Sequence, residues 1–303
     1  MNHSSTFSGQ FYIVDVFAES AYAGNQLAVF PPGRTYSSDE MQLIAREMHF
    51  SETTFITSEQ LDDGSFPVRI FTPEEELPFA GHPTLGTAYV IRELLSDHRA
   101  SEIVLHLKVG NIPVRWENLQ ERSVPFMTQA PPKFDKQVDP GSVKKLLGID
   151  LSDFDADFYP QIVSTGIPFC IVPLRSIDAV KKCVPQTNLF SSLFSLSESV
   201  GIHVFSTQTE QKGNDLHARV FTGMPSIPED PATGSANGCL AAYLIHHRYF
   251  GKDSIDIRVE QGFEMQRPSL LYLRAKKNDD DILVQVGGNV VPIASAQLFD
   301  KQP

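Results

Sequence analysis

The hydrophobic and polar positions of the chain form one pattern that occurs twice. Each copy reads as a strand rich in β-branched and aromatic residues, a polar loop and an almost wholly apolar helix, first over Arg69–Leu95 and again over Arg219–Ile245. The copies match at an offset of 150 and, after a two-residue insertion, of 152, in the pairs Arg69/Arg219, Phe71/Phe221, Thr72/Thr222, Ala80/Ala232 and Gly86/Gly238. Helices that are apolar on every side are buried. The pattern predicts two similar domains, each with one central helix.

Other helices are predicted by their end signals. Ser37 and Glu40 form a capping-box pattern that predicts a helix to about Met48. A cap, a proline and a terminating glycine predict a short helix from Asp139 to Leu147. A further helical stretch is expected near Leu189–Ser199.

Most remaining segments are predicted to be strands, including 10–17, 26–30 and 158–163, and a hairpin is predicted across 278–281. The segments 101–108, 112–117 and 124–128 alternate as successive antiparallel strands do. Gln129–Val138, with two adjacent prolines, is predicted to be a linker. The loop Ser164–Pro168 is expected to take in the second half the place that Ser51–Thr54 takes in the first. Regular βαβ alternation is missing, which excludes a Rossmann fold and a TIM barrel.

Both central helices should begin in glycine-containing loops, at Gly81-His82-Pro83 and at Thr233-Gly234-Ser235. Pro83 suits the first helical position, where a missing N–H costs nothing. Helix N-termini present unpaired N–H groups and the positive end of the dipole, and glycine lets a ligand approach the backbone. The sequence thus predicts that the two helix starts meet at a shared cleft that binds a carboxylate or a phosphate.

Composition narrows the class of partner. The 303 residues carry a formal net charge of -12 and contain no run of Lys or Arg, which argues against nucleic-acid and anionic-membrane partners. The polar N-terminus lacks a signal core, so we expect a cytoplasmic protein. The three cysteines Cys170, Cys183 and Cys239 lack metal-ligand spacing and are expected to be buried thiols. We expect no metal and no cofactor.

Glu52 is a carboxylate among apolar and β-branched neighbours in the strand Phe50–Ile56. One interpretation is an exposed residue on the polar face of an alternating strand. The other is a carboxylate in the cleft, where an apolar setting would raise its pKa and suit it to proton transfer. His82 and Asp230 have a similar alternative, because either could simply cap its helix. The residues alone leave both interpretations open.

Several motifs together resemble one known family. They are Ala23-Gly24-Asn25, Ser51-Glu52-Thr53-Thr54-Phe55, Phe79 to Gly86, Asp230 to Ala236, and Glu260-Gln261-Gly262 with Arg267-Pro268-Ser269. In this order, between about residues 11 and 299, they resemble the phenazine-biosynthesis-like PhzF family. The resemblance implies an α+β fold like that of diaminopimelate epimerase, with two pseudo-symmetric domains, each a curved, mostly antiparallel sheet round a central helix. The expected domains are 9–128, completed by a last strand at 289–299, and 129–288.

The resemblance also implies a site between the domains. Its catalytic residues would be Glu52, His82 and Asp230, and substrate would be held by Gly81, Pro83, Thr233, Gly234 and Ser235. Ser235 is the weaker of these, because a role as N-cap would explain it. Related epimerases and racemases use two thiols, whose positions are taken here by Ala80 and Pro231. A homodimer is implied as well.

From these residues we hypothesise a cofactor-independent isomerase that shifts a proton on a small carboxylate substrate. Glu52 would transfer the proton, and a neutral His82, favoured by the helix dipole, would donate a hydrogen bond. Two alternatives stay open. One is an epimerase or racemase without catalytic thiols on the same scaffold, and the other is a non-catalytic protein that binds a metabolite or a partner.

Overall fold

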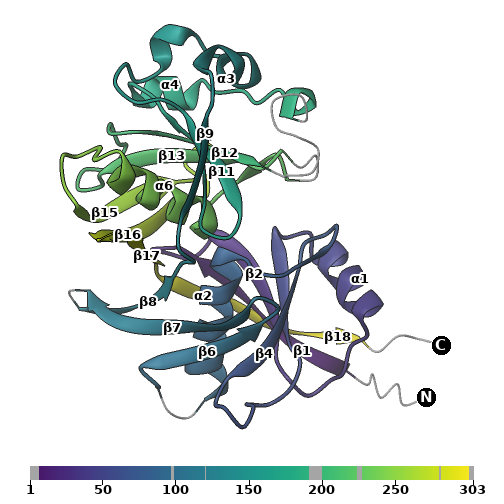
Figure 1. Cartoon of the computed structure of the whole chain (residues 1–303). Coiled ribbons are helices and arrows are strands. Elements are labelled where there is room, and N and C mark those ends of the chain that lie inside the picture. Colours follow the sequence, from purple (N-terminus) through teal and green to yellow (C-terminus); the bar gives the residue numbers. More distant parts are fainter. Residues whose placement is uncertain are drawn as a thin grey trace. The chain divides into compact units, whose positions relative to one another are not determined.

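The structure is a computed structural model of the chain and describes residues 7–96, 99–119, 121–190, 200–223, 227–279 and 281–299. It divides into two compact units. The N-terminal unit holds the chain up to Tyr22, Gln26–Met127 and the chain from Asn289 onward, and the C-terminal unit holds Ala23–Asn25 and Thr128–Gly288. Each unit has a curved sheet with one central helix (Figure 1).

In the N-terminal unit the sheet is built round α2 (Gly81–Val90), which continues as a π-helical turn, Ile91–Leu95. The strands are β1 (Phe7–Val16), β2 (Asn25–Phe30), β3 (Glu52–Ile56), β4 (Phe66–Phe71), β5 (Glu76–Leu77), β6 (Glu102–Leu107), β7 (Gly110–Leu119), β8 (Arg122–Thr128) and β18 (Val290–Phe299). Most neighbours are antiparallel, but β2 with β3 and β4 with β6 are parallel. The helix packs against β1, β3, β6, β7 and β18, and α1 (Ser38–Met48) packs against β3 and β4.

The C-terminal unit repeats this plan round α6 (Gly234–His246). Its strands are β9 (Lys133–Gln137), β10 (Gln161–Ser164), β11 (Pro168–Pro173), β12 (Gly201–Ser206), β13 (Leu216–Phe221), β14 (Glu229–Asp230), β15 (Ser254–Gln261), β16 (Ser269–Asn278) and β17 (Asp281–Gly287). Shorter helical elements are α3 (Pro140–Leu147), η2 (Leu151–Asp153), α4 (Ile177–Lys181) and η3 (Thr187–Leu189). The helix packs against β10, β11, β12, β15, β16 and β17.

Strand pairing repeats in the same order in both units. The parallel pair β2 and β3 corresponds to β11 and β12, and the parallel pair β4 and β6 corresponds to β13 and β15. Each repeat ends in a strand that pairs with the first strand of the other repeat, because β9 pairs with β10 and β18 pairs with β1. The duplication seen in the sequence therefore extends over the whole sheet of each unit.

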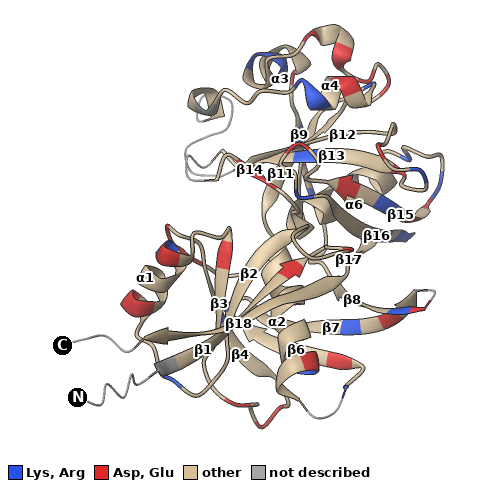
Figure 2. Ribbon diagram, turned by 180° about the vertical axis from the view of Figure 1, so that it is seen from behind, with Lys and Arg blue, Asp and Glu red and all other residues tan. Residues whose placement is uncertain are grey.

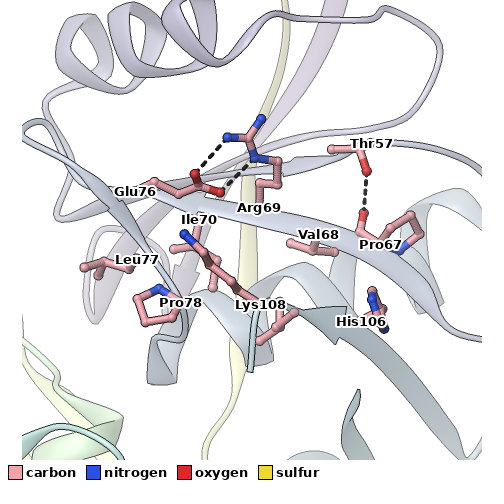
Figure 3. A pocket seen from close by; sticks show the side chains of 11 residues that line it. Thr57, Pro67, Val68, Arg69, Ile70, Glu76, Leu77, Pro78, His106 and Lys108 are labelled. Atoms are coloured by element: carbon pink, nitrogen blue, oxygen red, sulfur yellow. Dashed lines mark hydrogen bonds and ion pairs between the residues drawn. The ribbon is translucent and has the colours of Figure 1, made fainter. Parts of the chain in front are cut away.

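An arginine of each repeat is held in the same way. Arg69 makes a bidentate pair with Glu76, at 2.8 Å for both contacts, and Arg219 makes one with Glu229, also at 2.8 Å for both. Each guanidinium also lies over a phenylalanine ring of its own strand. Figure 3 shows the Arg69 pair beside Lys108 in a pocket of about 260 Å³ on the N-terminal unit.

Several local predictions are confirmed. Ser37 and Glu40 form both contacts of the capping box of α1, and Asp139 caps α3, which ends at the left-handed Gly148. The hairpin pairs Asn278 with Asp281.

Other local predictions are wrong. The linker contains strand β9, because Lys133–Gln137 pairs with β10. Pro83 is the third residue of its helix and not the first. The strand expected from residue 158 begins at Gln161. Of the helical stretch near Leu189–Ser199, residues 191–199 lie outside the described part of the chain.

The place of Glu52 in the second repeat was also mispredicted. Glu52 opens β3 beside Leu27 of β2, and the matching position opens β12, where Gly201 lies beside Phe169. Ser164–Pro168 instead links β10 to β11. The order of the strands shows that Gly201 is the residue of the second repeat that corresponds to Glu52. A comparison of polar loops does not show this.

Candidate active site

The starts of the two central helices differ from those of the other α-helices in the described part of the chain. Ser37, Asp139 and Ser176 accept hydrogen bonds from the first turns of α1, α3 and α4. The N-cap residues of α2 and α6, Ala80 and Thr233, make no such side-chain hydrogen bond. No N-cap side chain therefore occupies the backbone N–H groups of these two first turns, and helix starts of this kind are suited to anions.

Neither helix carries Lys, Arg, Asp or Glu, so no charged side chain of the helix itself competes for those groups. In Figure 2 α2 is tan throughout, whereas α1 shows acidic residues in red. The predicted helix starts are confirmed at Gly81 and Gly234. His82 and Asp230 are not N-caps, and neither is Ser235, which is the second residue of α6.

In the N-terminal unit the structure brings Glu52 and His82 together. Glu52 is the first residue of β3, and Thr54, two residues later on the same face, contacts Thr87 of α2 at 2.8 Å between hydroxyl oxygens. That contact ties the strand to the helix. Glu52 Oε2 lies 3.3 Å from His82 Nε2, and the side chains are 15% and 4% exposed. The interpretation of Glu52 as a residue of an exposed polar face is therefore wrong.

His82 is a neutral imidazole at neutral pH. Burial lowers the pKa of His82 to about 3. A hydrogen bond to the backbone of Gln26 raises the pKa, but its effect is smaller. The expected neutral state is thus supported, but burial, and not the helix dipole, is the main cause. The contact with Glu52 is accordingly a polar contact of an uncharged ring with a carboxyl group.

In the C-terminal unit the carboxyl group of Asp230 is held from both sides. Asn25 Nδ2 donates to Asp230 Oδ1 at 2.9 Å, and the hydroxyl of Thr233 donates to Asp230 Oδ2 at 2.5 Å. Asn25 also donates to the carbonyl of Ala232 at 3.0 Å. Asp230 is 6% exposed and lies just before the uncapped turn formed by Gly234 and Ser235.

The predicted site residues thus fall into two groups. Glu52, Gly81, His82 and Pro83 lie at the start of α2 in the N-terminal unit, and Asp230, Thr233, Gly234 and Ser235 lie at the start of α6 in the C-terminal unit. Thr233, which was predicted to bind substrate, uses its hydroxyl on Asp230.

Sequence reasoning gave no role to Asn25, Gln261 and Arg267, although all three lie in the quoted motifs. Arg267 donates to the carbonyls of Ala23 and Gly24 at 2.6 and 2.7 Å, which fixes the turn before Asn25. Gly262 has a φ of +78°, and a Cβ there would lie 2.5 Å from the carbonyl oxygen of Pro231. Asn25 and Gln261 each follow or precede a glycine with positive φ, Gly24 and Gly262, which marks a turn, but nothing in the sequence shows which groups the three side chains contact.

Burial disfavours the thiolate form of all three cysteines. Burial raises the pKa of Cys170 and Cys183 to about 12 and that of Cys239 to about 11. Cys239 lies in the interior of α6, where its thiol contacts Thr165. The thiols are thus buried, as expected, and none is at the start of a central helix.

Within the described ranges, no group of three or more His, Cys, Asp or Glu could hold a metal ion. No helix of that part of the chain is long and apolar enough to cross a membrane. The pocket in Figure 3, between β4, β5 and β6, has neither Glu52 nor His82 among its lining residues.

Comparison with known proteins identifies the family. The family model described as phenazine biosynthesis-like protein matches residues 14–296. The trans-2,3-dihydro-3-hydroxyanthranilate isomerase of Pseudomonas chlororaphis is 36% identical over 289 residues, which cover 93% of this chain and 96% of that protein.

Solved structures confirm the predicted fold class. A PhzF-family phenazine biosynthesis protein of Bacillus anthracis has a TM-score of 0.88 at 24% identity, covering 96% of this chain and 99% of that one. A probable proline racemase of Agrobacterium radiobacter has a TM-score of 0.64 at 10% identity, covering 97% and 94%. These two likenesses concern the fold alone. From the family model and the Pseudomonas relative it follows that the chain belongs to the phenazine biosynthesis-like (PhzF) family and is an isomerase.

Proposed function

We propose that this isomerase shifts a proton between two carbon atoms of a small carboxylate substrate, with Glu52 as the acid and base. The observation that carries the proposal is the contact of Glu52 with His82 at 3.3 Å, at the uncapped start of α2. A carboxyl group can remove a proton from one carbon and return it at another, because both steps use the same oxygen. No cofactor is needed for such a step.

His82 would stabilise the negative charge that develops on the substrate. A neutral imidazole donates a hydrogen bond without adding a full positive charge, and the pKa of about 3 keeps this ring neutral over the physiological range. The contact with Glu52 would also hold the carboxyl group in one orientation. Both roles require His82 to stay buried, which its exposure of 4% supports.

The start of α6 would bind the substrate through groups that do not exchange the proton. The backbone N–H groups of Gly234 and Ser235 suit a carboxylate, since they lie in a first turn without a side-chain cap. Asp230, already held by Asn25 and Thr233, would accept from an amine or hydroxyl of the substrate. The proposal requires both helix starts to contact the same substrate molecule.

Trans-2,3-dihydro-3-hydroxyanthranilate is a suitable first substrate to test. It is named as the substrate of the Pseudomonas relative, and by its name it carries a carboxylate, an amine and a hydroxyl. A proton shift on it would move a double bond. An epimerase on the same scaffold would instead exchange the hydrogen at a stereocentre and leave the double bonds in place.

The test is the rate of isomerisation by purified Glu52→Gln. We expect kcat/KM to fall by about 10²- to 10⁴-fold, the usual contribution of a positioned acid or base. Glu47→Gln is a matched control, because Glu47 is an exposed glutamate on α1 of the same unit. Wild-type rates for Glu52→Gln would contradict the proposal.

A further inference from the structure

Gln261 is completely buried and directs its side-chain amide at the start of α6. Its Nε2 donates to the carbonyl of Asp230 at 2.7 Å and to the hydroxyl of Thr233 at 3.3 Å. Its Oε1 accepts from the backbone N–H of Thr233 at 3.3 Å and from Asn237 Nδ2 at 2.9 Å. One side chain thus makes four contacts with a single loop and helix start.

These partners determine the orientation of the amide. The carbonyl of Asp230 can only accept, and the backbone N–H of Thr233 can only donate, so Nε2 must face the first and Oε1 the second. A hydroxyl has one hydrogen. Because Thr233 accepts from Gln261, that hydrogen is left for Asp230 Oδ2 at 2.5 Å. By donating to the Thr233 oxygen, Gln261 keeps the Thr233 hydrogen directed at the Asp230 carboxyl group, the only direction in which an ionised carboxylate can be bound.

The strand that carries Gln261 is fixed on its other face. Neighbouring residues of a strand point to opposite faces, and Glu260 contacts His217 at 2.8 Å and Asn214 at 2.7 Å. Glu260 also accepts from the backbone N–H groups of Glu210 and Gln211. The end of β15 is thereby pinned, so Gln261 is a rigid support.

We propose that Gln261 is a positioning residue, which orients the Asp230 carboxyl group and the first turn of α6 without touching the substrate. The inference rests on the proposed function, because it assigns Gln261 an effect that acts through Asp230. Sequence reasoning could not reach it, since Gln261 differs from any buried glutamine only by its partners.

Gln261→Glu tests this most sharply. It keeps the shape but replaces the donor by an oxygen, so the carbonyl of Asp230 loses its partner and the Thr233 hydroxyl can turn away from Asp230. We expect kcat/KM for trans-2,3-dihydro-3-hydroxyanthranilate to fall by about 10- to 100-fold, as for misplacements of about 1 Å. Gln261→Met, which buries no charge, is the second variant, with a smaller loss in the same direction.

A double-mutant cycle with Asp230→Asn separates positioning from a general loss of structure. If Gln261 acts through Asp230, its substitution costs little further activity once Asp230 is Asn. Independent, multiplying losses would overturn the inference, and so would wild-type kcat/KM in folded Gln261→Glu and Gln261→Met. If Asp230→Asn alone keeps full activity, the proposed role of Asp230 fails instead.

A crystal structure of Gln261→Glu tests the inference without any substrate. If Gln261→Glu does not fold, the crystal structure of Gln261→Met is used instead. We expect the contact of Thr233 Oγ1 with Asp230 Oδ2 to be lost or lengthened beyond hydrogen-bonding distance in Gln261→Glu, or the loop Asp230–Thr233 to be displaced in Gln261→Met. Unchanged geometry in the variant that folds would overturn the inference.

Discussion

The two central helices begin alike but carry different chemistry. Both α2 and α6 are buried, uncharged and without a side-chain cap. The start of α2 lies beside Glu52, whereas the matching position beside α6 is Gly201. His82 likewise matches Gly234 at the offset of 152. The duplication therefore preserved the helix start and placed the carboxyl–imidazole pair in only one copy.

The second copy has no room for such a pair. A Cβ on Gly201 would lie 2.6 Å from the ring of Phe169 and 3.2 Å from the carbonyl oxygen of Phe221. A carboxylate in this place would displace a buried aromatic ring. In the proposed mechanism, proton transfer would therefore belong to the N-terminal unit, and the C-terminal unit would hold polar groups of the substrate.

The duplicated arginines sharpen the comparison and give the largest expected effect on stability. Arg219 is 9% exposed and also donates to the carbonyls of Val180, Lys181 and Cys183, whereas Arg69 is 30% exposed. We expect Arg219→Leu to lower the free energy of unfolding by about 3 kcal/mol, because it removes the partner of the partly buried Glu229 carboxylate and of three backbone carbonyls. Arg69→Leu should cost about 0–1 kcal/mol.

Urea unfolding of both variants measures this difference. Substitutions of the partner glutamates, Glu76→Gln and Glu229→Gln, are matched controls. We expect Glu229→Gln to lower the free energy of unfolding more than Glu76→Gln does. Equal losses for Arg69→Leu and Arg219→Leu would mean that burial does not distinguish the two pairs.

The duplicated glycines of the central helices give a smaller effect. A Cβ on Gly86 would lie 2.6 Å from Leu27 and 2.8 Å from Val16, both buried and well packed. A Cβ on Gly238 would first meet the flexible side chain of Gln129 at 2.9 Å. We expect Gly86→Ala to lower the free energy of unfolding by about 1–3 kcal/mol, the usual effect of overpacking a core, and Gly238→Ala to lower it less. Thermal unfolding of the two variants checks the order, and a larger loss for Gly238→Ala would contradict it.

The stabilising effects of two buried histidines should have opposite pH dependence. Burial alone would lower the pKa of His217, but hydrogen bonds to Glu260 and Glu264 outweigh it and raise the pKa to about 9. Its stabilising contribution is therefore complete below about pH 6.5 and is lost as the pH rises through about 9. For His82, whose pKa is lowered to about 3, stability falls as the pH drops from about 6.5 towards 3.

The measurement is the free energy of unfolding of wild type minus that of His217→Gln and of His82→Gln, as a function of pH. The first difference should fall between about pH 6.5 and 9, and the second between about pH 6.5 and 3 on acidification. A flat difference for His217→Gln would mean that the imidazole is neutral in the folded protein.

Local signals in the sequence were sufficient for much of the fold. The repeat located both central helices, and end signals located α1 and α3, because caps and terminating glycines act within a few residues. Strand β9 was mistaken for a linker because two adjacent prolines precede it, and its pairing with β10 is not encoded locally. Gly201 was missed for the same reason, because strand order and not residue type defines its place.

The site was predictable only in part. The family resemblance, and not the residue pattern alone, assigned catalytic roles to Glu52, His82 and Asp230, and the structure brings the first two within 3.3 Å. The supports of Asp230 were not predictable, because Asn25 and Gln261 approach it from segments distant in sequence. Their catalytic and positioning roles remain predictions.

The most direct test of the central claim follows hydrogen in heavy water. Wild-type protein is incubated with trans-2,3-dihydro-3-hydroxyanthranilate in D₂O, and deuterium in substrate and product is located by NMR, with Glu52→Gln and Glu47→Gln in parallel. We predict that wild type and Glu47→Gln form the product equally fast, with deuterium only at the carbon that gains a hydrogen and only where the Glu52 carboxyl group exchanges with solvent before returning the proton, whereas Glu52→Gln gives neither product nor exchange. Equal exchange by wild type and Glu52→Gln would contradict the account.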